Sequence, residues 1–423
     1  MTRPDAHAGT GTVAPAPAAG RWRVFAVVAA AFFLAFLSRY ATAVIVPDLE
    51  RSFGIGAAEI GLLGATYFWA YAVMQPPAGL LADSIGPRRA VTGFLLLAGG
   101  GTALFALAAH FPLALVGRTV SGFGAGIVYV CGTKLFARWF GPRDFGPVTG
   151  AFAAVGNAGG LTAAGPFAAA IAALGWRGSF VALALLLVVA AAAVWWLVQD
   201  WPPGGGPEPG HASLLAGAGT VLRHPNTWLL GLYAFISLGV TASMQGLWTV
   251  PFLADVYGMD RAAAANALTL WAVGLMVGTP LWGYVADRLA RSRRGVLLLA
   301  TALHTALWAL LVWRTADLPR PMVVALLFWG GLTGGAWVPA YAQLKDSLPS
   351  AVAGTAVGIL NFAFFAGAAA FQQVTGLMLG TSGHRAPDAY RTVFAFFLAA
   401  LVMGLLALWR SRDAYPEPPP PRA

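Results

Sequence analysis

Long apolar segments, separated by short polar ones, recur along the whole chain of 423 residues. A helix needs about 20 apolar residues to cross roughly 30 Å of hydrocarbon, so segments of this length indicate membrane-spanning helices. The pattern predicts an all-α integral membrane protein with twelve transmembrane helices. We place them at about residues 24–46, 59–81, 90–109, 113–137, 148–172, 179–199, 227–252, 263–285, 296–313, 322–344, 352–379 and 392–409.

The composition supports a membrane protein, because 58% of the residues are hydrophobic and only 10% are charged. The net charge of +10 would be compatible with nucleic acid binding. Most basic residues, however, fall in the termini and in alternate loops that would share one side of the membrane. This bias follows the positive-inside rule and predicts a multi-pass protein of the cytoplasmic (inner) membrane with both termini in the cytoplasm. We therefore expect the lipid bilayer and a small-molecule substrate as partners, no nucleic acid, and a monomer.

The chain contains an internal repeat that is visible when the second half is aligned with the first. Residues that rarely match by chance fall in register, namely Pro47 with Pro251, Gly79 with Gly283, Asp83 with Asp287 and Asn157 with Asn361. The repeat predicts two six-helix units, 21–200 and 220–410, joined by a Pro/Gly-rich cytoplasmic linker at 201–219. The tails 1–20 and 411–423 are expected to be disordered. Carriers built from two like-oriented halves bind substrate between them near the middle of the membrane.

One motif occurs at the end of the second helix of each unit, as "GLLADSIGPRRA" from Gly79 and "GYVADRLARSRR" from Gly283. In the first copy, Gly79 permits close helix approach, and Asp83 can accept hydrogen bonds from a helix N-terminus or pair with arginine. Gly86 starts the turn that leads to the basic residues at the cytoplasmic face.

These sequences resemble the loop 2–3 signature of the major facilitator superfamily and its weaker second copy. Two further motifs support the resemblance over about residues 22–410: "GWRGSF" from Gly175, and a helix 4 signature formed by Arg118, Gly122, Gly124 and Gly126. The resemblance implies rocker-switch alternating access, with helices 1, 4, 7 and 10 lining a cavity, 2, 5, 8 and 11 at the interface, and 3, 6, 9 and 12 facing lipid. It also implies a conformational latch formed by Gly79, Asp83, Gly86, Arg88, Arg89, Gly283, Asp287 and Arg288. The alternative is that this motif only fixes topology.

Two cations lie inside apolar segments on helices that the resemblance assigns to the cavity, Arg39 on helix 1 and Lys134 on helix 4. No acidic residue lies deep in any predicted span, so an anionic substrate is the simplest source of countercharge. Arginine suits this role because its planar fork binds carboxylate or phosphate through two hydrogen bonds. Arg39 could instead reach the interface or lock a helix, and Lys134 could be a surface anchor.

Polar and aromatic residues on the same helices complete the candidate site. The residues expected to bind substrate are Arg39, Lys134, Tyr40, Tyr67, Gln245, Trp248 and Gln343. Four more are expected at the helix interface or at hinges: Arg118, Asn157, Pro166 and Asn361. The two asparagines could equally contact the substrate.

The predicted function is secondary active or facilitative transport of a small anionic or zwitterionic solute, such as a carboxylate, amino acid or peptide-like molecule. Coupling to protons, coupling to a counter-anion and uniport all stay open. The chain is most similar to the organic-anion and sugar-phosphate side of the superfamily, but helix 7 lacks the arginine that would favour phosphate esters. The alternatives are an efflux pump for drugs or metabolites and a transporter-like receptor. We expect no enzymatic activity, no catalytic residues, no metal and no cofactor, and we expect His304 to face outward.

Overall fold

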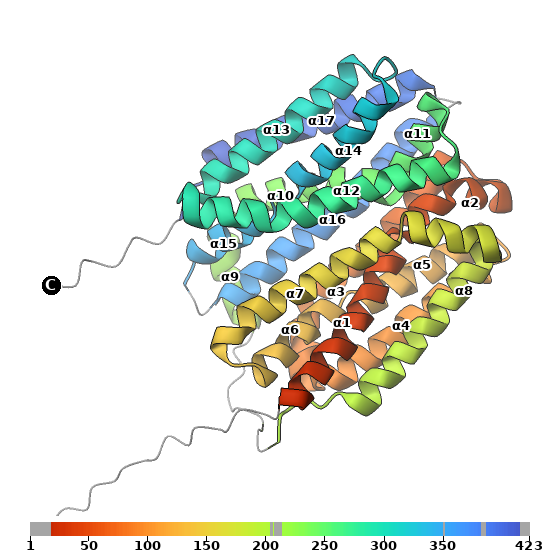
Figure 1. Cartoon of the computed structure of the whole chain (residues 1–423). Coiled ribbons are helices and arrows are strands. Elements are labelled where there is room, and N and C mark those ends of the chain that lie inside the picture. Colours follow the sequence, from red (N-terminus) through yellow and green to blue (C-terminus); the bar gives the residue numbers. More distant parts are fainter. Residues whose placement is uncertain (1–17, 204–205, 207–213, 350–351, 382–385, 415–423) are drawn as a thin grey trace, which may run out of the picture.

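The structure is a computed structural model that describes residues 18–203, 206, 214–349, 352–381 and 386–414. Within these residues every regular element is a helix, which confirms the predicted all-α fold. Ten stretches are long and apolar enough to cross a membrane. The helices α3 and α7 occupy the second and fifth predicted spans and complete a bundle of two halves (Figure 1).

The first half of the chain forms one group of packed helices, drawn from red to yellow-green in Figure 1. Its first span is interrupted, because α1 continues through a 3₁₀ segment, η1, into the short helix α2. The elements are α1 (Ala18–Tyr40), η1 (Ala41–Ile45), α2 (Val46–Phe53), α3 (Ala57–Ser84), α4 (Pro87–Ala106), α5 (Phe111–Ala125), α6 (Val128–Trp139), α7 (Pro142–Thr162) and α8 (Gly165–Leu197).

The second half repeats this plan, including an interruption at the matching place. Its first span passes through a π-helical segment, η2, where the first half has η1. The elements are α9 (Leu214–Arg223), α10 (Pro225–Ser243), η2 (Met244–Trp248), α11 (Thr249–Tyr257), α12 (Arg261–Tyr284), η3 (Val285–Leu289), α13 (Arg293–Trp313), α14 (Arg320–Gly334), α15 (Val338–Asp346), α16 (Ala353–Thr381) and α17 (Pro387–Arg410).

Some boundaries differ from the prediction. The predicted fifth span, 148–172, is divided, because α7 ends at Thr162 and Pro166 stands in the first turn of the next helix, α8. A proline is favoured there because its fixed φ suits a helix start and its missing N–H would be unpaired anyway. Within α8 the chain turns at Gly175, whose φ of 70° favours glycine, and the sixth span follows.

The flanking segments are also more ordered than predicted. The helix α9 begins inside the predicted linker. The first residues of the predicted C-terminal tail are bonded to the bundle, since Arg412 accepts from Gln343 and Asp413 accepts from Ser292. The prediction of disorder is therefore wrong for residues 411–413. Most of the predicted N-terminal tail lies outside the described residues.

The halves meet along α3 and α16, and α12 packs against α7 and α8. Their approach requires glycine, because a Cβ on Gly61 would lie 2.5 Å from the backbone oxygen of Gln372 and 2.7 Å from the Cα of Gly376. The helices α3, α7, α12 and α16 occupy the second, fifth, eighth and eleventh predicted spans, which the resemblance assigns to the interface.

Several contacts between the halves lie at the end of the bundle opposite the start of α1 and the end of α17 (Figure 1). There η1 packs against η2, and Asp48 of α2 forms an ion pair with Arg261 of α12, 2.5 Å apart. At the other end, the ion pairs of Lys134 with Asp83 and of Arg293 with Asp346 each join helices of one half. Packing contacts and an ion pair between the halves therefore lie at the end away from the start of α1.

Candidate functional site

Arg39 lies in the last turn of α1 and is 4% exposed. Its Cζ is 4.3 Å from the ring centres of Phe36 and Tyr71 and 5.1 Å from that of Phe365. These rings come from α1, α3 and α16, so both halves of the chain contact the guanidinium. Aromatic faces attract a cation, and this attraction offsets part of the cost of burying the charge.

The hydrogen-bonding capacity of Arg39 is only partly used. Its Nε and Nη2 are buried and make no hydrogen bond of good geometry, although the nearby hydroxyls of Tyr40, Tyr67 and Tyr71 interact with the guanidinium. These two nitrogens form one edge of the planar fork, which is an edge that can bind both oxygens of a carboxylate. No aspartate or glutamate is among the buried polar residues of the described chain. Among the described residues, Arg39 thus has no buried carboxylate to pair with.

Tyrosine side chains surround the guanidinium. The side chains of Tyr40, Tyr67 and Tyr71 all lie close to it, and the buried Tyr67 hydroxyl makes no hydrogen bond of good geometry. Arg118 lies over the ring of Tyr67, with its Cζ 4.4 Å from the ring centre. Arg118 also donates from Nη1 to the backbone oxygen of Ser38, 3.1 Å away, so it ties α5 to α1.

Further aromatic residues extend this cluster toward the second half. Tyr129 of α6 lies near Tyr71, and Tyr341 of α15 lies near both Tyr129 and Tyr71. The Tyr341 hydroxyl donates to Oδ1 of Asn361, which brings a predicted interface residue to the cluster. Asn157 of α7 is half-buried, and Pro166 lies in the first turn of α8.

The sequence reasoning missed the rings that contact Arg39. It assigned most aromatic residues to the core or the lipid belt, and so passed over Phe36, Tyr71, Tyr129, Tyr341 and Phe365. A usable signal existed, since Phe36 precedes Arg39 by three residues and therefore shares its face of the helix.

The segment η2 borders the cluster from the second half. A Cβ on Gly246 would lie 3.8 Å from the ring of Tyr40. Both Gln245 and Trp248 are buried, and the Trp248 indole donates to Thr375, 2.8 Å away. The Oε1 atom of Gln245 has no hydrogen-bond partner. Irregular turns of this kind are frequent at functional sites.

The contacts of Lys134 differ from those predicted. Its Nζ donates to Oδ1 of Asp83 over 2.6 Å and to the backbone oxygen of Gly79 over 2.7 Å. The expectation of a cation without a carboxylate neighbour is thus wrong for Lys134. The physical reason is that the C-terminal end of α3 offers carbonyl oxygens and a carboxylate, which favour a cation. Lys134 belongs with the latch motif.

The latch motif of the first half is held against the end of α8. Gly86 has a φ of 84°, and a Cβ there would lie 2.7 Å from Asp200. Asp200 accepts from the backbone N–H of Arg88, 2.7 Å away, and the Arg88 side chain donates to the backbone oxygen of Trp195. Arg89 is exposed.

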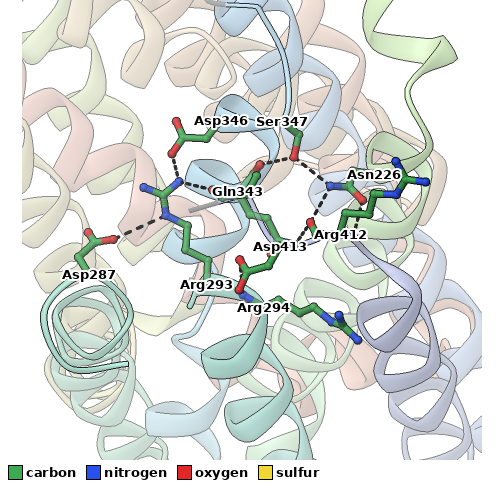
Figure 2. A network of polar contacts seen from close by, with 10 residues as sticks. Asn226, Asp287, Arg293, Arg294, Gln343, Asp346, Ser347, Arg412 and Asp413 are labelled. Atoms are coloured by element: carbon green, nitrogen blue, oxygen red, sulfur yellow. Dashed lines mark hydrogen bonds and ion pairs between the residues drawn. The ribbon is translucent and has the colours of Figure 1, made fainter. Parts of the chain in front are cut away.

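The second half has a corresponding arrangement, in which Arg294 donates to the backbone oxygen of Trp409 and its N–H to Asp413. Beside it, Arg293 forms ion pairs with Asp346 and with Asp287, whose Oδ1 is 3.6 Å from Nε (Figure 2). Two residues of this motif remain. A Cβ added at Gly283 would lie 3.8 Å from the side chain of Val338, and Arg288 is exposed.

Gln343, predicted to bind substrate, lies in this network and not among the rings around Arg39. Its Nε2 donates to the backbone oxygen of Arg412 over 2.9 Å and to Ser411 over 3.2 Å (Figure 2). His304, predicted to face outward, is instead buried and hydrogen-bonded to Thr333, 2.6 Å away. The prediction failed because a packed helix face and a lipid-facing one are equally apolar.

Comparison with known proteins agrees with this architecture. The chain is 24% identical over 409 residues to a probable sulfoacetate transporter of Cupriavidus necator, covering 92% of this chain and 93% of the relative. It is also 24% identical to a probable L-galactonate transporter of Escherichia coli, covering 82% and 80%.

Among solved structures, it matches a bacterial homologue of the human lysosomal transporter Spinster in an inward-facing, occupied conformation. The TM-score is 0.74 at 19% identity, over 92% of this chain and 96% of that one. The family model of the Major Facilitator Superfamily matches residues 28–371 and 241–423. The chain belongs to the Major Facilitator Superfamily.

Proposed function

We propose that this protein transports a small organic monoanion across the cytoplasmic membrane, with Arg39 as the residue that binds the anionic group. The observation that carries the proposal is the buried guanidinium with two unpaired donors and no buried acid among the described residues. A carboxylate or sulfonate would supply both the countercharge and the missing acceptors. The relatives named for sulfoacetate and galactonate are consistent with an anionic substrate.

The proposal favours a single negative charge. Lys134 is already paired with Asp83, and Arg118 already donates to the backbone of Ser38. Arg39 has two buried donors without a partner, whereas Arg118 has one, at Nε, and is held by its bond to Ser38. A dianion would keep one uncompensated charge in a low-dielectric site.

The proposed topology places both termini in the cytoplasm, because the basic residues concentrate on the side that the termini share. Closure at the opposite end would then leave the site reachable from the cytoplasm. Movement of the two halves about the α3–α16 contact would expose it alternately to the two sides.

The test combines uptake with thermal stability. Arg39→Met removes the charge but keeps an apolar side chain of similar length, and such replacements of buried ions often preserve or raise stability. We expect Arg39→Met to fold, to lose uptake of carboxylates and sulfonates into proteoliposomes, and to lose the rise in melting temperature that these anions cause in the unmodified protein. Arg39→Lys should weaken binding by roughly tenfold or more, since the ammonium loses the fork.

A matched control is Arg138→Met, which removes a cation that packs on Trp201 at the end of α6. It should leave the anion-induced stabilisation intact. If Arg39→Met melts at a lower temperature and still responds to the anions, Arg39 is a helix lock and the proposal is wrong.

A further inference from the structure

We propose that the transported anion carries a flat aromatic body, so that the substrate is an aryl monocarboxylate or a closely similar ring-bearing acid. This inference rests on the proposed function and concerns the part of the substrate that Arg39 does not bind. It starts from the groups that contact Arg39 directly, which are the rings of Phe36, Tyr71 and Phe365.

The rings around Arg39 belong to a continuous aromatic network. Phe36 contacts Phe32 with ring centres 4.8 Å apart, and Phe32 contacts Tyr129 at 5.4 Å. On the other side, Tyr71 and Phe365 lie 4.2 Å apart and join the first half to the second. Phe36, Tyr129 and Phe365 are only partly buried, so their rings keep surface that another ring can cover.

The orientation of the anion follows from the unpaired edge of the guanidinium. A carboxylate bound to Nε and Nη2 lies in the plane of the fork, and a conjugated ring attached to it tends to share that plane. The rings of Phe36, Tyr71 and Phe365 lie over the guanidinium. Aromatic pairs prefer ring centres about 4.5–7 Å apart, which is the spacing already found within the network.

A polyhydroxylated acid fits this environment less well. Each of its hydroxyls would need a directional partner, and a buried hydroxyl without one is costly. The side chains in direct contact with Arg39 have aromatic faces, and the amide of Asn361 already accepts from Tyr341. The aromatic faces around Arg39 therefore favour ring-bearing anions, and the unpaired Tyr67 hydroxyl and Gln245 Oε1 can pair with a hydroxyl on the ring.

The experiment measures binding to the purified full-length protein by calorimetry, with thermal shift as a second readout. The probes are 4-hydroxybenzoate, its neutral analogue 4-hydroxybenzamide, D-galactonate and sulfoacetate. We expect 4-hydroxybenzoate to bind at least about tenfold more tightly than the other three, and Arg39→Met to abolish this binding.

Two substitutions on α16 test the aromatic contact. Phe365→Leu keeps apolar volume but removes the ring, and should weaken 4-hydroxybenzoate binding by about three- to tenfold. Phe365→Tyr keeps the ring and should bind almost as well, which controls for misfolding. Phe362→Leu, three residues away and 39% exposed, is the matched control and should have no effect.

The outcomes separate the two proposals. If galactonate or sulfoacetate binds more tightly than 4-hydroxybenzoate and needs Arg39, the aromatic inference is overturned and the anion transporter stands. The inference also fails if Phe365→Leu binds 4-hydroxybenzoate as well as Phe362→Leu does. If none of the anions binds in a way that depends on Arg39, both proposals fail.

Discussion

Buried and half-buried cations in this chain are distinguished by their partners. Arg118 is bonded to a backbone oxygen, Lys134 is bonded to Asp83 and Gly79, and Arg39 is surrounded by rings with one edge unpaired. All three stand in apolar stretches of sequence. What separates them is the helix that packs opposite each one, which a single sequence does not reveal.

The Lys134–Asp83 pair gives the first residue-scale prediction. Asp83→Asn and Lys134→Gln remove the same ion pair, so each should slow transport while leaving anion affinity near that of the unmodified protein. The Lys134 side chain is 29% exposed and the Asp83 side chain 36%, so the pair should contribute no more than about 1 kcal/mol to the free energy of unfolding.

A double-substitution cycle checks this pairing. Because both changes break one contact, their effects on transport rate should not add. Additive effects would show that Asp83 and Lys134 act separately. A large loss of anion affinity in Lys134→Gln would return Lys134 to the substrate site.

At the scale of elements, the sequence predicts where helices lie better than how they face. The twelve spans follow from apolar length, and the turn at Gly175 follows from its motif. The outward orientation of His304 was wrong and the position of Gln343 was missed, because lipid and protein interior are equally apolar solvents for a helix face. The interruptions η1 and η2 leave no clear mark in the apolar pattern, although they occupy matching places in the repeat.

The seam between α3 and α16 gives the second prediction. Gly61→Ala would place a methyl group 2.5 Å from the Gln372 backbone oxygen, so the helices must separate at the closed end. We expect a shift of the population toward the state open at that end. Spin labels at Leu107 and Trp313, each 70% exposed, would report a longer distance between the halves.

Gly93→Ala is the matched control, because an added Cβ there meets nothing within 4 Å. It should leave the distance unchanged. An unchanged distance in Gly61→Ala as well would mean that α3 and α16 do not separate during closure and opening.

At the scale of the whole molecule, the ion pairs differ between the two ends of the bundle. Within the described residues, the network of Arg293 and Asp346 ties together one half only (Figure 2). Asp48 and Arg261 connect the two halves. The repeat predicts this two-body plan, and the family membership agrees with it. The ion pair itself could not be predicted, because Asp48 and Arg261 are far apart in the sequence and belong to different halves.

The Asp48–Arg261 pair is expected to bias the carrier toward the state closed at the far end. Arg261→Gln should therefore raise the population that is open there, and a loss of about 1 kcal/mol would change the ratio of the two states about fivefold. Asp48 also pairs with Arg51 within α2, 2.7 Å away, so Arg51→Gln removes a comparable cation without touching the contact between the halves. The Leu107–Trp313 distance should lengthen in Arg261→Gln, stay unchanged in Arg51→Gln, and recover in the charge exchange that combines Asp48→Arg with Arg261→Asp. If Arg51→Gln lengthens the distance as much as Arg261→Gln does, the effect comes from the charge of Asp48 within α2, and the two halves are held closed by packing alone.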